Sequence, residues 1–211
     1  WRRANPFGAL RLLRSHHQLW RLSTISFIGY IAHEALPIVF VVYTLHRYHW
    51  TPALNGITLM IVGACSVAVS TSTGWFVAKL GERMTLVLGL MFAVLGFALM
   101  GAAPTGTIYI LAIPLICLWG IYSPAVQNLM TRRVSRAEQG ELQGAIGSLR
   151  SIAMLIGPGI FTWTFASFIT RWDVPGAPWY LAAAMMVLSL AVAIQTVRSA
   201  DYAAAPVGES A

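Results

Sequence analysis

Three ionisable side chains fall inside otherwise apolar stretches of the sequence: His33, Glu34 and Arg150. Within hydrocarbon such a group costs about 2.5 to 3.5 kcal/mol on insertion scales, so its presence indicates a function. Glu34 lies at the middle of the stretch from about 22 to 45, where burial disfavours a charged carboxyl group. It is therefore a candidate for proton coupling or cation binding, or a residue that only ties helices together. His33 could share the proton or pack in the core.

Arg150 lies about ten residues into the apolar stretch from 141 to 169, near enough to one edge of a bilayer for its side chain to snorkel. An inward-facing contact with an anion or with Glu34 is the alternative. Four residues of another stretch could line a cavity in which a planar ligand stacks on the rings and forms hydrogen bonds: Trp119, Tyr122, Gln127 and Asn128. Aromatic packing between helices would also explain the two rings.

The amino-acid composition indicates which kind of secondary structure holds these residues. The 211 residues are 57% hydrophobic and 10% charged, against roughly 25% charged in soluble domains, which excludes a water-soluble globule. A bilayer core of about 30 Å needs roughly 20 apolar residues per helix. Six stretches qualify, at about 22–45, 54–77, 84–103, 107–130, 141–169 and 179–197. We therefore predict an all-α membrane protein with a transmembrane domain at 22–197.

Basic residues set the predicted orientation. Of the 14 lysines and arginines, eleven fall on one side of the spans and two, Arg47 and Arg171, on the other, so both ends are expected in the cytoplasm. The net charge of +7 then fits a membrane surface and needs no nucleic-acid partner. Residues 1–21 are predicted to form a basic linker with a possible interfacial helix, and residues 198–211 a disordered tail.

Glycine, proline and charge also mark positions where helices bend or turn. Pro37, Gly157 and Pro158 fall within spans, where proline removes an intrahelical hydrogen bond and bends the axis. A tight charged turn is expected between the second and third spans. The charges alone are also explained by a turn that is exposed to solvent and has no further role. Its residues are Gly74, Lys79, Gly81, Glu82 and Arg83.

Several segments resemble one family of transporters. Residues 74–83 and 86–89 are similar to the cytoplasmic turn between the second and third helices in the C-terminal half of tetracycline-efflux-type members of the major facilitator superfamily. Residues 130–144 and 156–158 resemble the same family's fourth loop and fifth helix, and residues 47–50 the end of its first helix. The similarity extends over roughly residues 20 to 195.

The resemblance implies the second half of a twelve-helix bundle, with a 3+3 inverted repeat, a partner N-terminal half and a location in the bacterial inner membrane. It further implies that the charged turn helps to hold and release the cytoplasmic face during alternating access. Where the family pattern has a histidine and an aspartate, this chain has Cys65 and Ala93. Tetracycline is therefore not assured as the substrate.

Enzyme chemistry finds little support in the motifs. His33 and Glu34 do not begin an HExxH motif, because position 37 is proline, and Ser123 lacks the GxSxG frame. No cofactor or metal is expected. We predict half of a proton-coupled secondary transporter that exports a small organic compound or drug. The alternative is a membrane scaffold or assembly protein that transports nothing.

Overall fold

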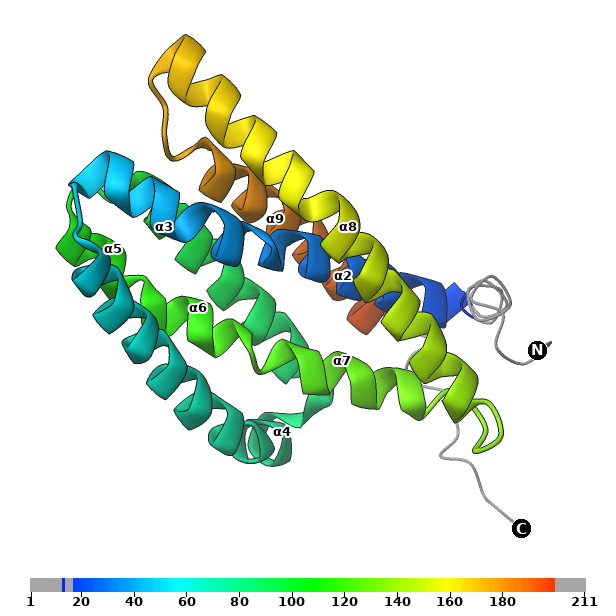
Figure 1. The fold of residues 1–211 in the computed structure, drawn as a ribbon. Helices are drawn as coiled ribbons and strands as arrows, with labels where there is room; N and C mark the ends of the chain where they lie inside the picture. Colours follow the sequence, from blue (N-terminus) through cyan, green and yellow to red (C-terminus); the bar gives the residue numbers. More distant parts are fainter. Residues whose placement is uncertain (1–12, 14–16, 200–211) are drawn as a thin grey trace.

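The computed structural model describes residue 13 and residues 17–199, and every regular element within them is an α-helix. In chain order these are α2 His17–His33, α3 Ala35–Tyr48, α4 Pro52–Ala102, α5 Gly106–Leu111, α6 Ile113–Trp119, α7 Tyr122–Thr131, α8 Gln139–Trp172 and α9 Ala177–Arg198. They form one elongated bundle (Figure 1). The predicted all-α membrane class is confirmed. Most of the predicted linker and tail lies outside the described residues, but residues 17–21 of the predicted linker form the start of α2.

Helix α4 contains two of the predicted spans. Its 51 residues would extend about 77 Å if straight, more than twice the roughly 30 Å of hydrocarbon. The helix is interrupted at Gly81, whose φ of 77° and ψ of 161° are not helical, and Figure 1 shows the ribbon turning back beside the α4 label. Five described helical stretches, rather than the predicted six, are therefore long and apolar enough to cross a membrane. The count differs because one residue, and not a loop, separates two spans.

The first apolar stretch, Leu19–Tyr48, is divided at Glu34 into α2 and α3. Pro37 explains the break, because it has no N–H to donate to the carbonyl of His33 and its ring crowds that carbonyl. The Glu34 amide donates instead to the carbonyl of Ile31, three residues back, at 3.0 Å. The proline thus produces a tightened turn at the level of the predicted functional residue.

The stretch Gly106–Thr131 is divided in the same way. It is broken at Ala112, two residues before Pro114, and again just before Pro124, which gives the three short helices α5, α6 and α7. Pro158, in contrast, lies inside α8 without ending it. Prolines therefore account for the interruptions in two of the membrane-spanning stretches.

The core lies where α4 packs against α9, α6 and α7, and where α2 packs against α9 and α8. One end of it is aromatic, with ring centroids 5.4 to 6.4 Å apart among Phe40, Tyr43, Tyr48, Trp50, Tyr109 and Trp179. The Tyr48 hydroxyl donates to the carbonyl of Ala103 at 2.8 Å, and the Tyr43 hydroxyl to that of Met100 at 3.3 Å. These bonds fix the end of α3 to the end of α4.

Helix α8 is the most exposed of the long helices. Leu155 is 80% exposed and Trp163 67% exposed, and an added Cβ at Gly140, Gly144 or Gly147 would meet nothing within 4 Å. Apolar surface of this extent requires lipid or another protein to cover it.

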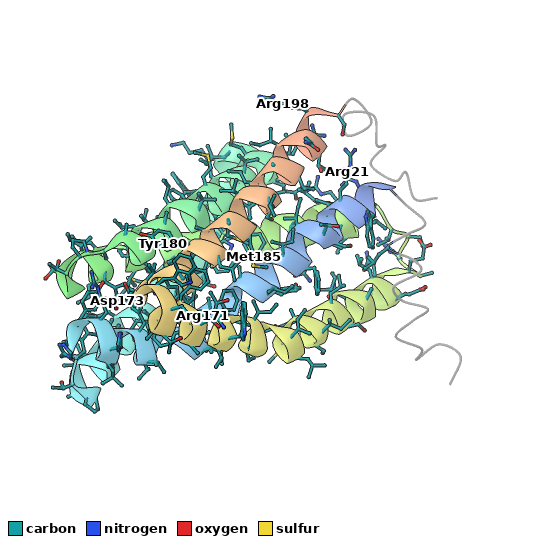
Figure 2. All side chains as sticks on the ribbon, turned by 90° about the horizontal axis from the view of Figure 1, so that it is seen from above. Arg21, Arg171, Asp173, Tyr180, Met185 and Arg198 are labelled. Atoms are coloured by element: carbon teal, nitrogen blue, oxygen red, sulfur yellow. The ribbon has the colours of Figure 1, made fainter. Side chains whose placement is uncertain are left out.

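The two ends of the bundle carry different parts of the chain. Arg21, near the start of α2, and Arg198, at the end of α9, lie at one end, whereas Arg171 and Asp173 lie toward the other (Figure 2). The first and last described helices therefore have their outer ends on the same side of the bundle.

The break at Gly81 predicts a contrast between two glycines of α4. Gly81→Ala should lower the free energy of unfolding by about 1 to 3 kcal/mol, because a residue with a Cβ is strained at this φ and ψ. Gly74→Ala is the matched control, since Gly74 is helical and an added Cβ would meet nothing within 4 Å. It should leave stability unchanged or raise it by up to about 1 kcal/mol. Thermal unfolding in detergent measures both, and equal effects would contradict the assigned turn.

Candidate functional site

A cavity of about 760 Å³ lies among α2, α3, α4, α6, α7 and α8. Five of the residues singled out for chemistry in separate stretches of the sequence line this one cavity: His33, Glu34, Trp119, Tyr122 and Arg150. Its wall also includes Pro37, Gly120 and Pro124, which belong to the helix breaks. The breaks and the ionisable side chains therefore lie at the same place in the bundle.

Glu34 occupies the turn between α2 and α3, partly buried, with its side chain packed against α8. A Cβ added at Gly157 would lie only 2.6 Å from Glu34 Cγ and 2.7 Å from Glu34 Cβ. The glycine therefore makes room for the acid, which is a packing role in addition to the predicted bending. No ion pair joins Glu34 to Arg150, and both residues are within the described part of the chain.

An aromatic wall lines the same cavity as Glu34. The His33 imidazole lies 5.8 Å from the Trp119 ring, and Trp119 stacks on Tyr122 at 5.6 Å with an interplanar angle of 16°. Tyr122 is held by close backbone approaches, because its hydroxyl end lies against Gly29 and its Cβ would be 2.7 Å from a Cβ on Gly89. The wall is therefore rigid, while His33 itself is exposed.

Arg150 is exposed on α8 and supplies the positive charge of the cavity. Tyr30, His33 and Tyr122 line the same space. The cavity thus has one acidic and one basic side chain that are not paired with each other.

Two predicted lining residues lie elsewhere. Gln127 and Asn128 are exposed on α7 and do not line this cavity. The Gln127 amide donates instead to Gln143 Oε1 on α8 at 3.3 Å. Three hydroxyl residues of α4 that the sequence reasoning did not single out do line the cavity: Ser66, Ser70 and Thr73. Their spacing of four and three residues places them on one helix face, and this pattern in the sequence could have identified them as lining residues.

The charged turn of α4 is tied to the end of α7. Glu82 Oε1 lies 2.9 Å from Arg132 Nη2, and the Glu82 side chain is only 10% exposed. Lys79 Nζ lies 4.9 Å from the centre of the Trp75 ring, and Arg83 is partly buried in the same turn. Gly74 lies on the exposed helical surface just before it. The turn is therefore packed, not merely solvated.

The side chains that line the cavity are suited to binding a ligand. Stacked rings, hydroxyl groups and two unlike charges suit a small amphipathic molecule. Among the described residues there is no group of three His, Cys, Asp or Glu side chains that could hold a metal ion.

Comparisons with known proteins agree with this arrangement. Residues 2–158 match the family model of the Major Facilitator Superfamily. The chain is 27% identical over 187 residues to the tetracycline resistance protein, class C, of Escherichia coli, which covers 88% of this chain and 47% of the relative. It is 29% identical over 191 residues to the class G protein of Vibrio anguillarum, covering 90% and 48%.

A further relative is the Hippocampus abundant transcript 1 protein of Mus musculus, 23% identical over an alignment that covers 92% of this chain and 45% of that protein. The chain therefore spans about half the length of the curated relatives it matches. The resemblance to tetracycline-efflux-type proteins is confirmed. With the family match extending over most of its length, the chain is an integral membrane protein of the major facilitator superfamily.

Proposed function

We propose that this chain is the second six-helix half of a proton-coupled exporter that moves a small organic compound by alternating access. Family membership, which also agrees with the prediction that the chain is not an enzyme, supports the transport role. The half-length match to resistance proteins supports the half-transporter assignment and an N-terminal partner half. We further propose the bacterial inner membrane, with both ends of this segment in the cytoplasm.

The observation that carries the proposal is the cavity with an acid at its wall. Glu34 lies at the middle of a membrane-spanning stretch, at a helix break, beside a space of about 760 Å³. Such placement lets the carboxyl group exchange a proton with the cavity and respond to whatever fills it. A passive scaffold requires neither the cavity nor the acid.

The partner half would cover the surfaces that this half leaves open. The apolar face of α8 around Leu155, together with the glycines at its start, offers close approach to a second bundle. In this role the turn around Gly81 and Glu82 would hold and release the cytoplasmic face, through the ion pair with Arg132.

Removing the acid tests the proton role. Glu34→Gln keeps the shape of the side chain but cannot take up and release a proton, so proton-driven export should fall to the level of vesicles without the protein. Glu141→Gln is the matched control, because Glu141 is an exposed acid in the first turn of α8 and does not line the cavity. It should retain full transport.

The measurement uses the full-length protein in inside-out vesicles with an imposed pH gradient. A panel of amphipathic organic compounds is supplied, and a pH-sensitive dye reports proton movement. Wild-type rates from Glu34→Gln at normal expression would refute the proton role.

Replacing Arg150 tests whether its charge faces the cavity. We expect Arg150→Lys to weaken transport, since a lysine cannot reproduce the planar fork of the guanidinium group, and Arg150→Gln to abolish it. Arg171→Lys, in the exposed last turn of α8, is the control and should have no effect. Full activity of Arg150→Lys with the same panel would show that the side chain only reaches toward the membrane surface.

The Glu34 contact with α8 gives a structural test. Gly157→Ala should displace the acid, lower the free energy of unfolding by about 1 to 3 kcal/mol and reduce transport, because the new methyl group would overlap Glu34. Gly159→Ala, two residues along the same helix, would meet nothing within 4 Å and should behave as wild type. Thermal unfolding and vesicle transport are measured together. If both variants behave alike, Glu34 does not pack on Gly157.

A further inference from the structure

Helix α8 places the two charges of the cavity along one of its faces. Glu34 packs against Gly157, where an added Cβ would lie 2.6 Å from Glu34 Cγ. Arg150 lies seven residues before Gly157, which is two turns of an α-helix, so both positions share a face of α8. Arg150 and Glu34 both line the cavity. The acid and the base therefore border one space from points that are about 10 Å apart along the axis of α8.

Neither charge is neutralised within the part of the chain that the structure describes. Among residues 13 and 17–199, neither Glu34 nor Arg150 forms an ion pair. A charge that is removed from water without a partner of opposite sign is strongly destabilising. Under the function proposed above, the N-terminal half covers this space. Each charge then requires an opposite charge on the molecule that fills the cavity.

The surface between the two charges is apolar. Met154 lies four residues after Arg150 and three before Gly157, so it belongs to the same face of α8. It lines the cavity and is 54% exposed. Its thioether is flexible and packs favourably on aromatic rings. Four further apolar residues line the same space: Leu36, Val62, Val69 and Ile116.

We propose that the cavity binds elongated aromatic zwitterions, with the ammonium group at Glu34, the carboxylate at Arg150 and the rings over Met154. This proposal names the substrate class of the exporter proposed above and rests on that function. A compound with a single charge would leave one of the two side chains unpaired, whereas a zwitterion compensates both. The guanidinium group also matches a carboxylate with two parallel hydrogen bonds. A zwitterion has no net charge, so its movement does no work against the membrane potential.

Four biphenyl compounds test the proposal by their binding to the purified full-length protein, measured by isothermal titration calorimetry. 4′-(Aminomethyl)biphenyl-4-carboxylic acid carries the two charges at opposite ends of its linked rings. 4-Phenylbenzylamine and biphenyl-4-carboxylic acid each carry one of these charges, and 4-phenylphenylalanine carries both on a single carbon atom. The end-to-end zwitterion should bind at least about tenfold more tightly than each of the others. Equal binding of any other compound, or no binding of the end-to-end zwitterion, would overturn the proposal.

Two variants assign each charge to its side chain. Arg150→Gln should lower the affinity for the end-to-end zwitterion to that for 4-phenylbenzylamine, without weakening the binding of this amine. Glu34→Gln should lower it to that for biphenyl-4-carboxylic acid, without weakening the binding of this acid. Glu141→Gln, at an exposed acid outside the cavity, should bind every compound as the wild type does. Wild-type affinity for the end-to-end zwitterion in either cavity variant would refute the assigned contact.

The result is separable from that of the vesicle experiment. Calorimetry requires no pH gradient, and the comparison among the four compounds in the wild-type protein stays decisive if a variant fails to fold. Preference for the end-to-end zwitterion without proton-driven export would refute the transport role and leave the binding site. Proton-driven export without this preference would refute the zwitterion site and leave the transport role.

Discussion

Hydrocarbon offers no water to a backbone carbonyl or amide, so each of these groups must find its partner within the protein. Most of this chain meets the requirement with continuous helices, but Pro37, Pro114 and Pro124 each remove one donor. The breaks before Pro37 and Pro124 contribute directly to the cavity wall. Irregular backbone is tolerated at membrane depth where it lines such a space. The same prolines that interrupt the helices therefore build the cavity.

The two sides of the cavity differ in how firmly they are packed. Tyr122 is enclosed by the glycines at 29 and 89, so the aromatic wall has little freedom to move. Another side includes Arg150 and Met154 of α8, a helix whose apolar residues are largely exposed. Glu34 packs on Gly157 of the same helix. A shift of α8 would therefore change the surroundings of the acid while the stacked rings stay in place.

The sequence predicts most of the spans, because long apolar stretches are strong signals. It also shows which charges fall within them, and the structure places Glu34 and Arg150 at one cavity. It cannot show that a single residue, Gly81, joins two spans, since that depends on one pair of backbone angles. The placement of Gln127 and Asn128 depends on how α7 is rotated after its break, which periodicity does not supply. The sequence does not mark Thr73 as a cavity residue, because a threonine in a membrane helix commonly donates its hydroxyl to a carbonyl of the preceding turn. The Thr73 hydroxyl does so, to the carbonyl of Val69.

The charged turn and the cavity share two helices. Helix α7 begins at Tyr122 in the aromatic wall and ends beside Arg132, about 15 Å away, where the ion pair with Glu82 is formed. The part of α4 that follows Gly81 returns to the same wall at Gly89, which contacts Tyr122. Densely packed helices shift as units and do not deform gradually. A movement of the turn that broke the ion pair would therefore displace the wall of the cavity as well, which links the Gly81 turn to the cavity.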